Sequence, residues 1–194
     1  MRNAEVKRMT AETKIVVSLE LDGTGKTEIS TGIGFFDHML NLFAAHGRFD
    51  LKVKCDGDME VDGHHSVEDI GIALGQALKE ALGDKRGIAR YGTFYLPMDE
   101  ALAFVSLDIS ARPFLVYEGG EMSPMIGGYD TELTEEFLRA LAVHGGLTLH
   151  ARVLYGKNSH HKVEAIFKAL GHALRIAVSK DARMEGIPST KGIL

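Results

Sequence analysis

A single cysteine, Cys55, occurs among the 194 residues, so no disulfide can form within one chain. The thiol lies in the alternating segment 51–55, which indicates a strand position on the core side rather than a catalytic one. No run of about 18 apolar residues could cross a membrane, and residues 1–8 lack the apolar stretch of a signal peptide. We therefore expect a cytoplasmic protein with no membrane partner.

Charge of one sign is not in large excess either. The net charge is −5 at pH 7, which argues against nucleic acid as the main partner. No Gly/Ser-rich linker or low-complexity segment divides the chain. With 45% hydrophobic and 25% charged residues the composition is that of a globular protein. A chain of this length buries roughly 70% of its unfolded surface, so we expect it to fold without a stabilising disulfide.

What the chain does contain is the pentapeptide His-His-x-x-Glu, twice, at 64–68 and 160–164. On a helix, residues three and four apart lie on nearly the same face, so each copy directs two imidazoles and a carboxylate roughly the same way. Imidazole and carboxylate together suit a divalent first-row metal. Burying these groups without a metal would leave polar atoms unpaired, so the two copies predict metal binding.

The repeat extends beyond this motif, because residues 37–47 align with 135–145 at an offset of 98 residues. The offset falls to 96 at the His-His pairs, so the second half has two fewer residues in the intervening loop. The corresponding pairs in the aligned stretch are His38 with Glu136 and His46 with His144.

Hydrophobic periodicity predicts the same order of elements in both halves. We expect strands at 14–21, 49–55, 94–96, 101–107 and 147–154. We expect short helices at 35–46 and 131–145, and long helices that begin at each His pair and end at about Leu82 and Val178. Residues 22–25, Asp-Gly-Thr-Gly, are typical of a hairpin turn.

Each half is thus an α+β unit, a small sheet with two helices on one face. Packing about a pseudo-twofold axis would bury the apolar helix faces between the halves. We expect a single compact domain made of two repeats, about 1–86 and 87–180, followed by a tail at 181–194.

Six to eight nitrogen and oxygen ligands fit two octahedral ions of the Mn²⁺ or Fe²⁺ type better than structural Zn²⁺, which takes four ligands. Adjacent residues on a helix point about 100° apart, so the two histidines of each pair should serve different ions. Of the other histidines, His172 is interpreted as structural. His46 and His144 stand at helix ends and can interact with the helix dipole, although His46 could instead contact a ligand. For His150 both a structural and a site role stay open.

Several groups could hold an anion. They are Arg90, Arg112, Lys168, Ser189, Thr190 and Lys191. Each alone is typical of a solvated surface. Lys168, however, lies two helical turns after His161 on the same side, and the hydroxyl, amide and ammonium donors of segment 189–192 suit phosphate. As a set beside a two-metal site, these residues predict a phosphorylated substrate.

The most characteristic motifs of the chain are residues 34–40, 62–70, 108–113, 156–165 and 188–192. In these motifs and in their order the chain resembles the imidazoleglycerol-phosphate dehydratase family, and the resemblance covers nearly the whole chain. It implies helices sandwiched between two mixed β-sheets, a 24-subunit assembly, and two Mn²⁺ ions per active site where subunits meet. Fe²⁺ or another divalent ion stays open. The implied ligands are His38, His65, Glu68 and His161 for one ion, and His64, Glu136, His160 and Glu164 for the other. Many family members have histidine in place of Glu136.

The resemblance also implies the reaction, dehydration of imidazole glycerol phosphate to imidazole acetol phosphate in histidine biosynthesis, through a metal-bound imidazolate and a diazafulvene-like intermediate. The candidate catalytic carboxylates are Glu12, Glu68 and Glu164. The implied substrate-binding residues are Glu12, His38, His46, Arg90, Arg112, Lys168, Ser189, Thr190 and Lys191.

Two other functions fit part of the sequence. A two-metal hydrolase of phosphate esters would release phosphate, whereas a dehydratase leaves the phosphate in place and forms a ketone. A metal-storage or metal-dependent assembly protein would explain the His pairs but not the arginines or the segment 189–191.

Overall fold

The computed structural model describes residues 1–184 and 186–192 of the chain. Each half contains four strands of a main sheet and two helices. In the first half these are β1 (Asn3–Met9), β2 (Thr13–Glu20), β3 (Thr27–Ser30), α1 (Gly34–Gly47), β4 (Asp50–Gly57) and α2 (His64–Leu82). In the second half they are β5 (Tyr91–Met98), β6 (Ala101–Asp108), β7 (Phe114–Glu118), α3 (Leu133–Gly145), β10 (Thr148–Tyr155) and α4 (Ser159–Val178). A short hairpin, β8 (Met125–Ile126) and β9 (Tyr129–Asp130), precedes α3.

The two main sheets have the same topology. Their strand orders are β1-β2-β4-β3 and β5-β6-β10-β7. In each sheet the last pair, β3 with β4 and β7 with β10, is parallel, and the other pairs are antiparallel. The predicted α+β fold with two similar halves and two mixed sheets is therefore confirmed.

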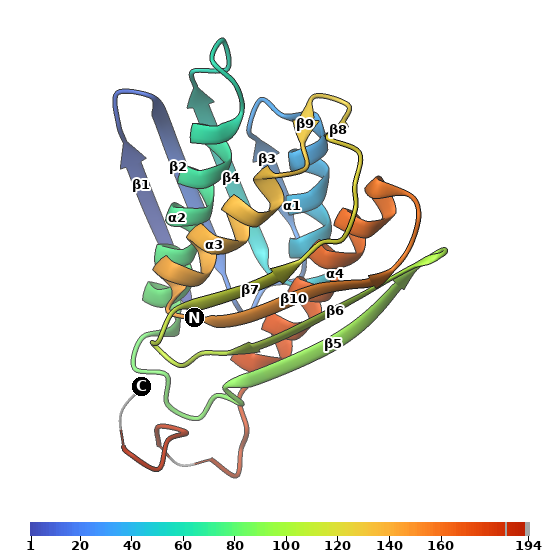
Figure 1. The fold of residues 1–194 in the computed structure, drawn as a ribbon. Coiled ribbons are helices and arrows are strands. Elements are labelled where there is room, and N and C mark those ends of the chain that lie inside the picture. Colours follow the sequence, from blue (N-terminus) through green and yellow to red (C-terminus); the bar gives the residue numbers. More distant parts are fainter. Residues whose placement is uncertain (185, 193–194) are drawn as a thin grey trace.

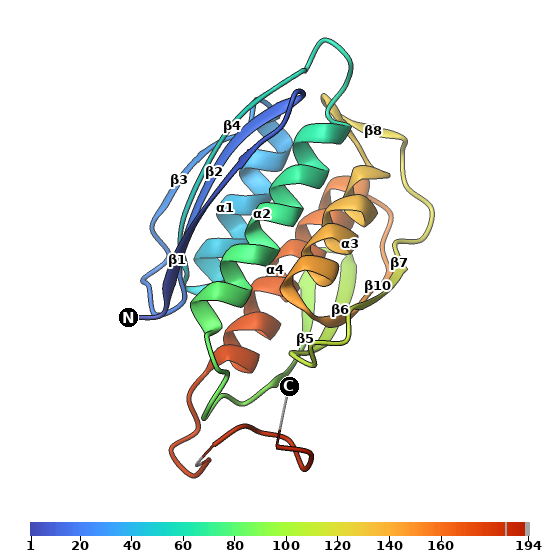
Figure 2. The same ribbon diagram turned by 90° about the vertical axis from the view of Figure 1, so that its left-hand side faces the viewer.

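The four helices lie between the two sheets (Figures 1 and 2). Helices α1 and α2 pack against the first sheet and α3 and α4 against the second, while α2 packs on α3 and α1 on α4. The strand sequences explain the layering, because alternate residues of β2, such as Ile15, Val17 and Leu19, are buried against the helices. The core is thus formed where the apolar helix faces meet each other and the inner faces of the sheets.

Two glycines allow the helix pairs to approach closely. A Cβ at Gly171 in α4 would lie 2.4 Å from the carbonyl oxygen of Phe43 in α1, and a Cβ at Gly75 in α2 would lie 2.9 Å from that of Leu141 in α3. Phe43 and Leu141 are 98 residues apart, the offset seen in the sequence alignment. The same close contact therefore occurs in both halves, and it sets the spacing between the helices that carry the histidines.

The hairpin expected at residues 22–25 is wrong. Strand β2 pairs with β4, and β3 runs parallel to β4, so the turn does not join paired strands. The carboxylate of Asp50 explains the local structure, because one of its oxygens accepts hydrogen bonds from the amides of Thr24, Gly25 and Lys26 at 2.7, 3.0 and 2.9 Å. These bonds, chiefly the one from Thr24, lower the pKa of Asp50. The N-terminal strand β1 was also not predicted.

The helix boundaries agree closely with the expected ones. Helix α2 begins at His64 and ends at Leu82, followed by Gly83 with a φ of 57°. Helix α4 begins one residue before His160, and the side chain of Asn158 caps it. Cys55 is half-buried on β4 and packs against the core. None of the described helices is long and apolar enough to cross a membrane.

Candidate functional site

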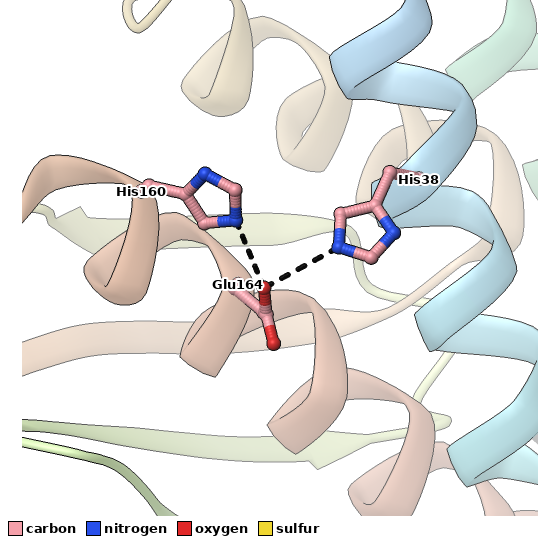
Figure 3. A group of neighbouring side chains, drawn as sticks. All are labelled: His38, His160 and Glu164. Carbon is pink, nitrogen blue, oxygen red and sulfur yellow. Dashed lines mark hydrogen bonds and ion pairs between the residues drawn. The ribbon is translucent and has the colours of Figure 1, made fainter.

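Three candidate ligands converge where α1 packs on α4 (Figure 3). Glu164 Oε2 lies 3.0 Å from His160 Nε2 and 3.4 Å from His38 Nε2. One nitrogen of each imidazole and one oxygen of the carboxylate all lie within 4.8 Å of one another. In the part of the chain that the structure describes, this is the one group of three or more His, Cys, Asp or Glu residues with that spacing. We call His38, His160 and Glu164 the α1–α4 cluster.

Glu164 is held ionised in this cluster. Its side chain is only 7% exposed, and its other oxygen, Oε1, lies 2.5 Å from Lys168 Nζ. Burial by itself raises the pKa of Glu164, but the hydrogen bond and charge of Lys168, together with the bond from His160, outweigh burial and lower it. One oxygen is thus bound to an ammonium group while the other faces two imidazoles. Two nitrogens and a carboxylate oxygen form a donor set that fits a divalent first-row metal.

The corresponding residues of the first half lie where α2 packs on α3. His64 Nε2 is 3.9 Å from Glu68 Oε2, and His64 and Glu136 line the same cavity of about 510 Å³. Here His64 corresponds to His160, Glu68 to Glu164 and Glu136 to His38. We call His64, Glu68 and Glu136 the α2–α3 cluster. The side chain of Glu68 is 45% exposed, whereas that of Glu164 is 7% exposed, so the carboxylate of this cluster is the more open one.

The second histidine of each pair faces a loop carboxylate. His65 Nδ1 lies 2.9 Å from Asp58 Oδ2 and 3.8 Å from Glu12 Oε2. His161 Nδ1 lies 2.7 Å from Glu100 Oε2. The hydrogen bonds to Asp58 and Glu100 are the main reason that the pKa of each imidazole is raised. The two histidines of a pair therefore point to different partners.

One subunit does not assemble either of the two ligand sets implied by the resemblance. The α1–α4 cluster joins His38, implied for one ion, with His160 and Glu164, implied for the other. His65 and His161 stand beside separate loops, at Asp58 and at Glu100. The eight candidate ligands thus lie in two half-sites, one on each pair of packed helices.

Five of the expected anion-binding residues line one cavity of about 460 Å³. They are Arg90, Arg112, Ser189, Thr190 and Lys191. Lys168 is not among them; it lies in α4, where its ammonium group is bound to Glu164. The predicted tail at 181–194 thus contributes three residues to the cavity, while its residues 185, 193 and 194 lie outside the described residues.

Arg90 links this cavity to the tail. Its guanidinium donates to both oxygens of Asp108, at 2.7 and 3.0 Å, and to the carbonyl oxygen of Pro188 at 2.8 Å. The bidentate pair with Asp108 raises the pKa of Arg90 further. Pro188 directly precedes Ser189, so Arg90 positions the polar end of the tail as well as lining the cavity.

His46 and His172 contact each other. The nitrogens His46 Nδ1 and His172 Nε2 are 3.1 Å apart, and the ring of Phe94 stacks on His172 with 4.1 Å between centroids. Burial is the main cause that lowers the pKa of both imidazoles. His144 lies in the last turn of α3, and His150 is exposed on β10.

The sequence matches a family model along most of its length, since the model of imidazoleglycerol-phosphate dehydratase matches residues 31–174. The imidazoleglycerol-phosphate dehydratase of Acetivibrio thermocellus is 58% identical over 193 residues, which cover 100% of this chain and 99% of the relative. That of Clostridium botulinum (strain Kyoto / Type A2) is 61% identical over 191 residues, or 98% and 97% of the two chains. The chain belongs to the imidazoleglycerol-phosphate dehydratase family.

Two solved structures of this family resemble the fold closely. The crystal structure of imidazoleglycerol-phosphate dehydratase from Staphylococcus aureus N315 has a TM-score of 0.84 and 42% identity, over 92% of this chain and 99% of that chain. The structure of IGPD from Pyrococcus furiosus in complex with (S)-C348 has a TM-score of 0.84 and 39% identity, over 97% and 100%. Membership of the imidazoleglycerol-phosphate dehydratase family confirms the predicted enzyme class, a carbon–oxygen hydro-lyase of histidine biosynthesis.

Three carboxylates in this dehydratase were missed by sequence reasoning: Asp58, Glu100 and Asp108. Glu100 could have been found from the duplication, because it directly precedes β6 as Glu12 directly precedes β2. That correspondence is visible only when β1 and β2 are recognised as the counterpart of β5 and β6. Asp58 and Asp108 carry no comparable signal, since they act through contacts with His65 and Arg90 that depend on the fold.

Proposed function

We propose that this dehydratase converts imidazole glycerol phosphate to imidazole acetol phosphate with two divalent ions, Mn²⁺ or a similar metal such as Fe²⁺, in each active site. The observation that carries the proposal is the α1–α4 cluster, in which two imidazole nitrogens and a buried, ionised carboxylate lie within 4.8 Å of one another. When bound, the ions would act as Lewis acids and favour the imidazolate form of the substrate's ring. A route through a diazafulvene-like intermediate requires that form.

We propose further that each active site combines half-sites from different subunits. Each half-site of one chain holds four of the eight candidate ligands, and two octahedral ions would take all eight, with other donors such as water filling the remaining positions. The α1–α4 cluster of one subunit would then meet the α2–α3 cluster of another, with His65 and His161 completing the two sets. The divided ligand sets support sites shared between subunits, and the family resemblance suggests a closed assembly of 24 subunits that would repeat this arrangement.

The cavity between Arg90 and the tail suits the substrate's phosphate. Arg112 and Lys191 would contribute positive charge, and Ser189 and Thr190 would contribute hydroxyl donors. The amide of Lys191 donates to Ser189 Oγ at 3.2 Å, which holds these two side chains in one turn. Binding energy gained at the phosphate would orient the reacting carbons, which lie between the imidazole ring and the phosphate-bearing carbon of the substrate. Lys168 is proposed as a further contact to the phosphate, and His46 as a further contact to the substrate.

Glu12 is the residue that we propose for proton transfer. It stands in the turn between β1 and β2, where its amide donates to Thr10 Oγ, and its side chain is about half exposed. Its carboxylate is 3.8 Å from His65, close to the proposed metal ligands without being bound to one. Glu164 is paired with Lys168 and suits ligation better than proton donation. Glu68 is exposed enough to serve in either role.

An assay with imidazole glycerol phosphate and Mn²⁺-loaded protein tests the proposal. We expect the absorbance of an enol or ketone product to appear without release of inorganic phosphate. Phosphate release would instead favour the two-metal hydrolase, and metal binding without turnover would favour a storage or assembly protein. A cytoplasmic location is proposed together with this biosynthetic role.

A further inference from the structure

We propose that Asp58 and Glu100 are matched positioning residues that fix which nitrogen of His65 and His161 is available to a metal. The inference rests on the proposed metal-dependent function and adds two residues to it. Each carboxylate accepts a hydrogen bond from Nδ1 of the second histidine of a His-His pair, at 2.9 Å for Asp58 and 2.7 Å for Glu100. A ring that donates from Nδ1 has its Nε2 lone pair free for ligation.

The geometry of the two sites is alike although the residues come from different segments. Asp58 follows β4, and its amide donates to the carbonyl oxygen of Glu12 in the β1–β2 turn. Glu100 lies in the β5–β6 turn, and its Oε1 accepts from the amides of Lys157 and Asn158, just before α4. In both halves a carboxylate therefore connects a strand turn to the first turn of the long helix and orients the same histidine of the pair.

Burial supports a specific role for Asp58. Its Oδ2 is bound to His65, whereas its Oδ1 is buried with no hydrogen-bond partner among the described residues. A buried carboxylate oxygen without a partner is costly, so its presence calls for an explanation beyond stability. Orientation of His65 is such an explanation. At the other site His161 Nε2 faces Asp99 at 3.7 Å, which is too long for a hydrogen bond and leaves this nitrogen accessible.

The duplication also explains why Glu12 is available for other chemistry. Glu12 and Glu100 occupy the same place, the residue before the second strand of each hairpin. Glu100 is bound to His161, but the corresponding position beside His65 is filled by Asp58, and Glu12 is 3.8 Å away. Asp58 thus takes the orienting role in the first half, and Glu12 is left unengaged by His65.

The inference can be tested without relying on turnover by titrating the intact protein with Mn²⁺. Calorimetry and the electron paramagnetic resonance signal of free Mn²⁺ measure the binding. Carboxylates that orient metal-ligating histidines typically change metal affinity by about 10–100-fold. We expect a loss in that range for Glu100→Ala and for Asp58→Ala. Glu100→Gln should lose less, because its amide oxygen still accepts from Nδ1. Glu28→Gln, which alters an exposed carboxylate paired with Lys52, serves as the control and should not change the affinity.

Glu100→Ala could lower Mn²⁺ affinity either because His161 is no longer oriented or because the N-terminus of α4 is loosened, and a double-mutant cycle distinguishes these two causes. In a His161→Ala background, Glu100→Ala should cause no further loss of Mn²⁺ affinity if Glu100 acts through His161. An equal loss in both backgrounds would overturn the inference, as would unchanged affinity in folded Glu100→Ala and Asp58→Ala variants. If the unaltered protein bound no Mn²⁺ at all, the metal-dependent function itself would fail, which is a distinct result.

Discussion

Lys168 lies one helical turn after Glu164 in α4, and its ammonium group is 2.5 Å from the buried carboxylate. The bond occupies one carboxylate oxygen and leaves the other directed at His38 and His160. Lys168 therefore keeps Glu164 ionised and oriented in the absence of a metal. The ion pair between Lys168 and Glu164 therefore contributes to the stability of the fold and also orients a candidate metal ligand.

Replacing Lys168 with Met should destabilise the metal-free protein, because it removes the strongest partner of a buried carboxylate. Loss of a hydrogen bond between charged groups costs about 1.5–3 kcal/mol, and both side chains are largely buried. Urea unfolding followed by circular dichroism measures the effect. Added Mn²⁺ should restore part of the stability, since a cation at Oε2 also compensates the charge. Lys52→Met, which breaks an exposed pair with Glu28, should cost less than about 1 kcal/mol, and an equal loss in both variants would contradict this.

Gly171→Ala should disturb the metal site from a distance. The new Cβ would lie 2.4 Å from the carbonyl oxygen of Phe43, so α1 and α4 must separate. Overpacking of this kind costs about 1–3 kcal/mol. Because His38 is on α1 and Glu164 on α4, the separation should also weaken Mn²⁺ binding, measured by calorimetry at a temperature where the variant is folded. Gly34→Ala, at a position where a Cβ meets nothing within 4 Å, is the matched control.

Asp50→Asn should reduce stability at neutral pH and have little effect in acid. The pKa of Asp50 is lowered in the folded state from its ordinary value of 3.8, chiefly by the amides of Thr24 and Lys26. A carboxyl group with a lowered folded pKa contributes stability above its unfolded pKa and loses it as the pH falls through the folded value. The difference between the two proteins in urea should therefore be present at pH 7 and shrink below about pH 3.8. A constant difference would mean that the charge of Asp50 does not hold the loop.

The sequence predicted those features that depend on local periodicity. Helix α2 begins at His64 as expected, and the correspondence of His64 and Glu68 with His160 and Glu164 follows from residue spacing alone. The loop at Asp50 and the parallel pairing of β3 were missed, because both depend on residues more than 20 positions apart.

In the site too, contacts within one helix could be predicted from the sequence, whereas contacts between elements could not. Helical spacing could place His160 and Glu164 on one face, and they are 3.0 Å apart. It could not place His38 beside them, because that contact depends on how α1 packs on α4. The partners of His65 and His161 come from loops whose paths carry no periodic signal. The geometry within one helix could therefore be predicted from the sequence. Contacts between elements could be predicted only where the duplication or the family resemblance indicated them.

Arg112→Ala and Lys191→Ala should lower kcat/KM and leave metal content unchanged. Both residues line the cavity formed with the tail, away from the α1–α4 cluster. Loss of one charged hydrogen bond to a phosphate, at about 1.5–3 kcal/mol, corresponds to about a 10–100-fold decrease. Steady-state kinetics and metal analysis of the same samples provide the measurement. Lys180→Ala, whose ammonium group binds the carbonyl oxygen of Arg86, is a control for loss of a positive charge. Full activity in both cavity variants would exclude this cavity as the phosphate site.

Removal of metal should weaken association between subunits. In one chain the candidate ligands are divided between the α1–α4 cluster and the α2–α3 cluster. If ions join half-sites of different subunits, metal binding and assembly are linked, and each stabilises the other. Light scattering before and after a chelator should therefore show a decrease in mass, reversed by Mn²⁺. His64→Ala, which removes a ligand from the open half-site, should lower the mass even with Mn²⁺ present. An unchanged mass in both experiments would count against metal ions that join half-sites of different subunits.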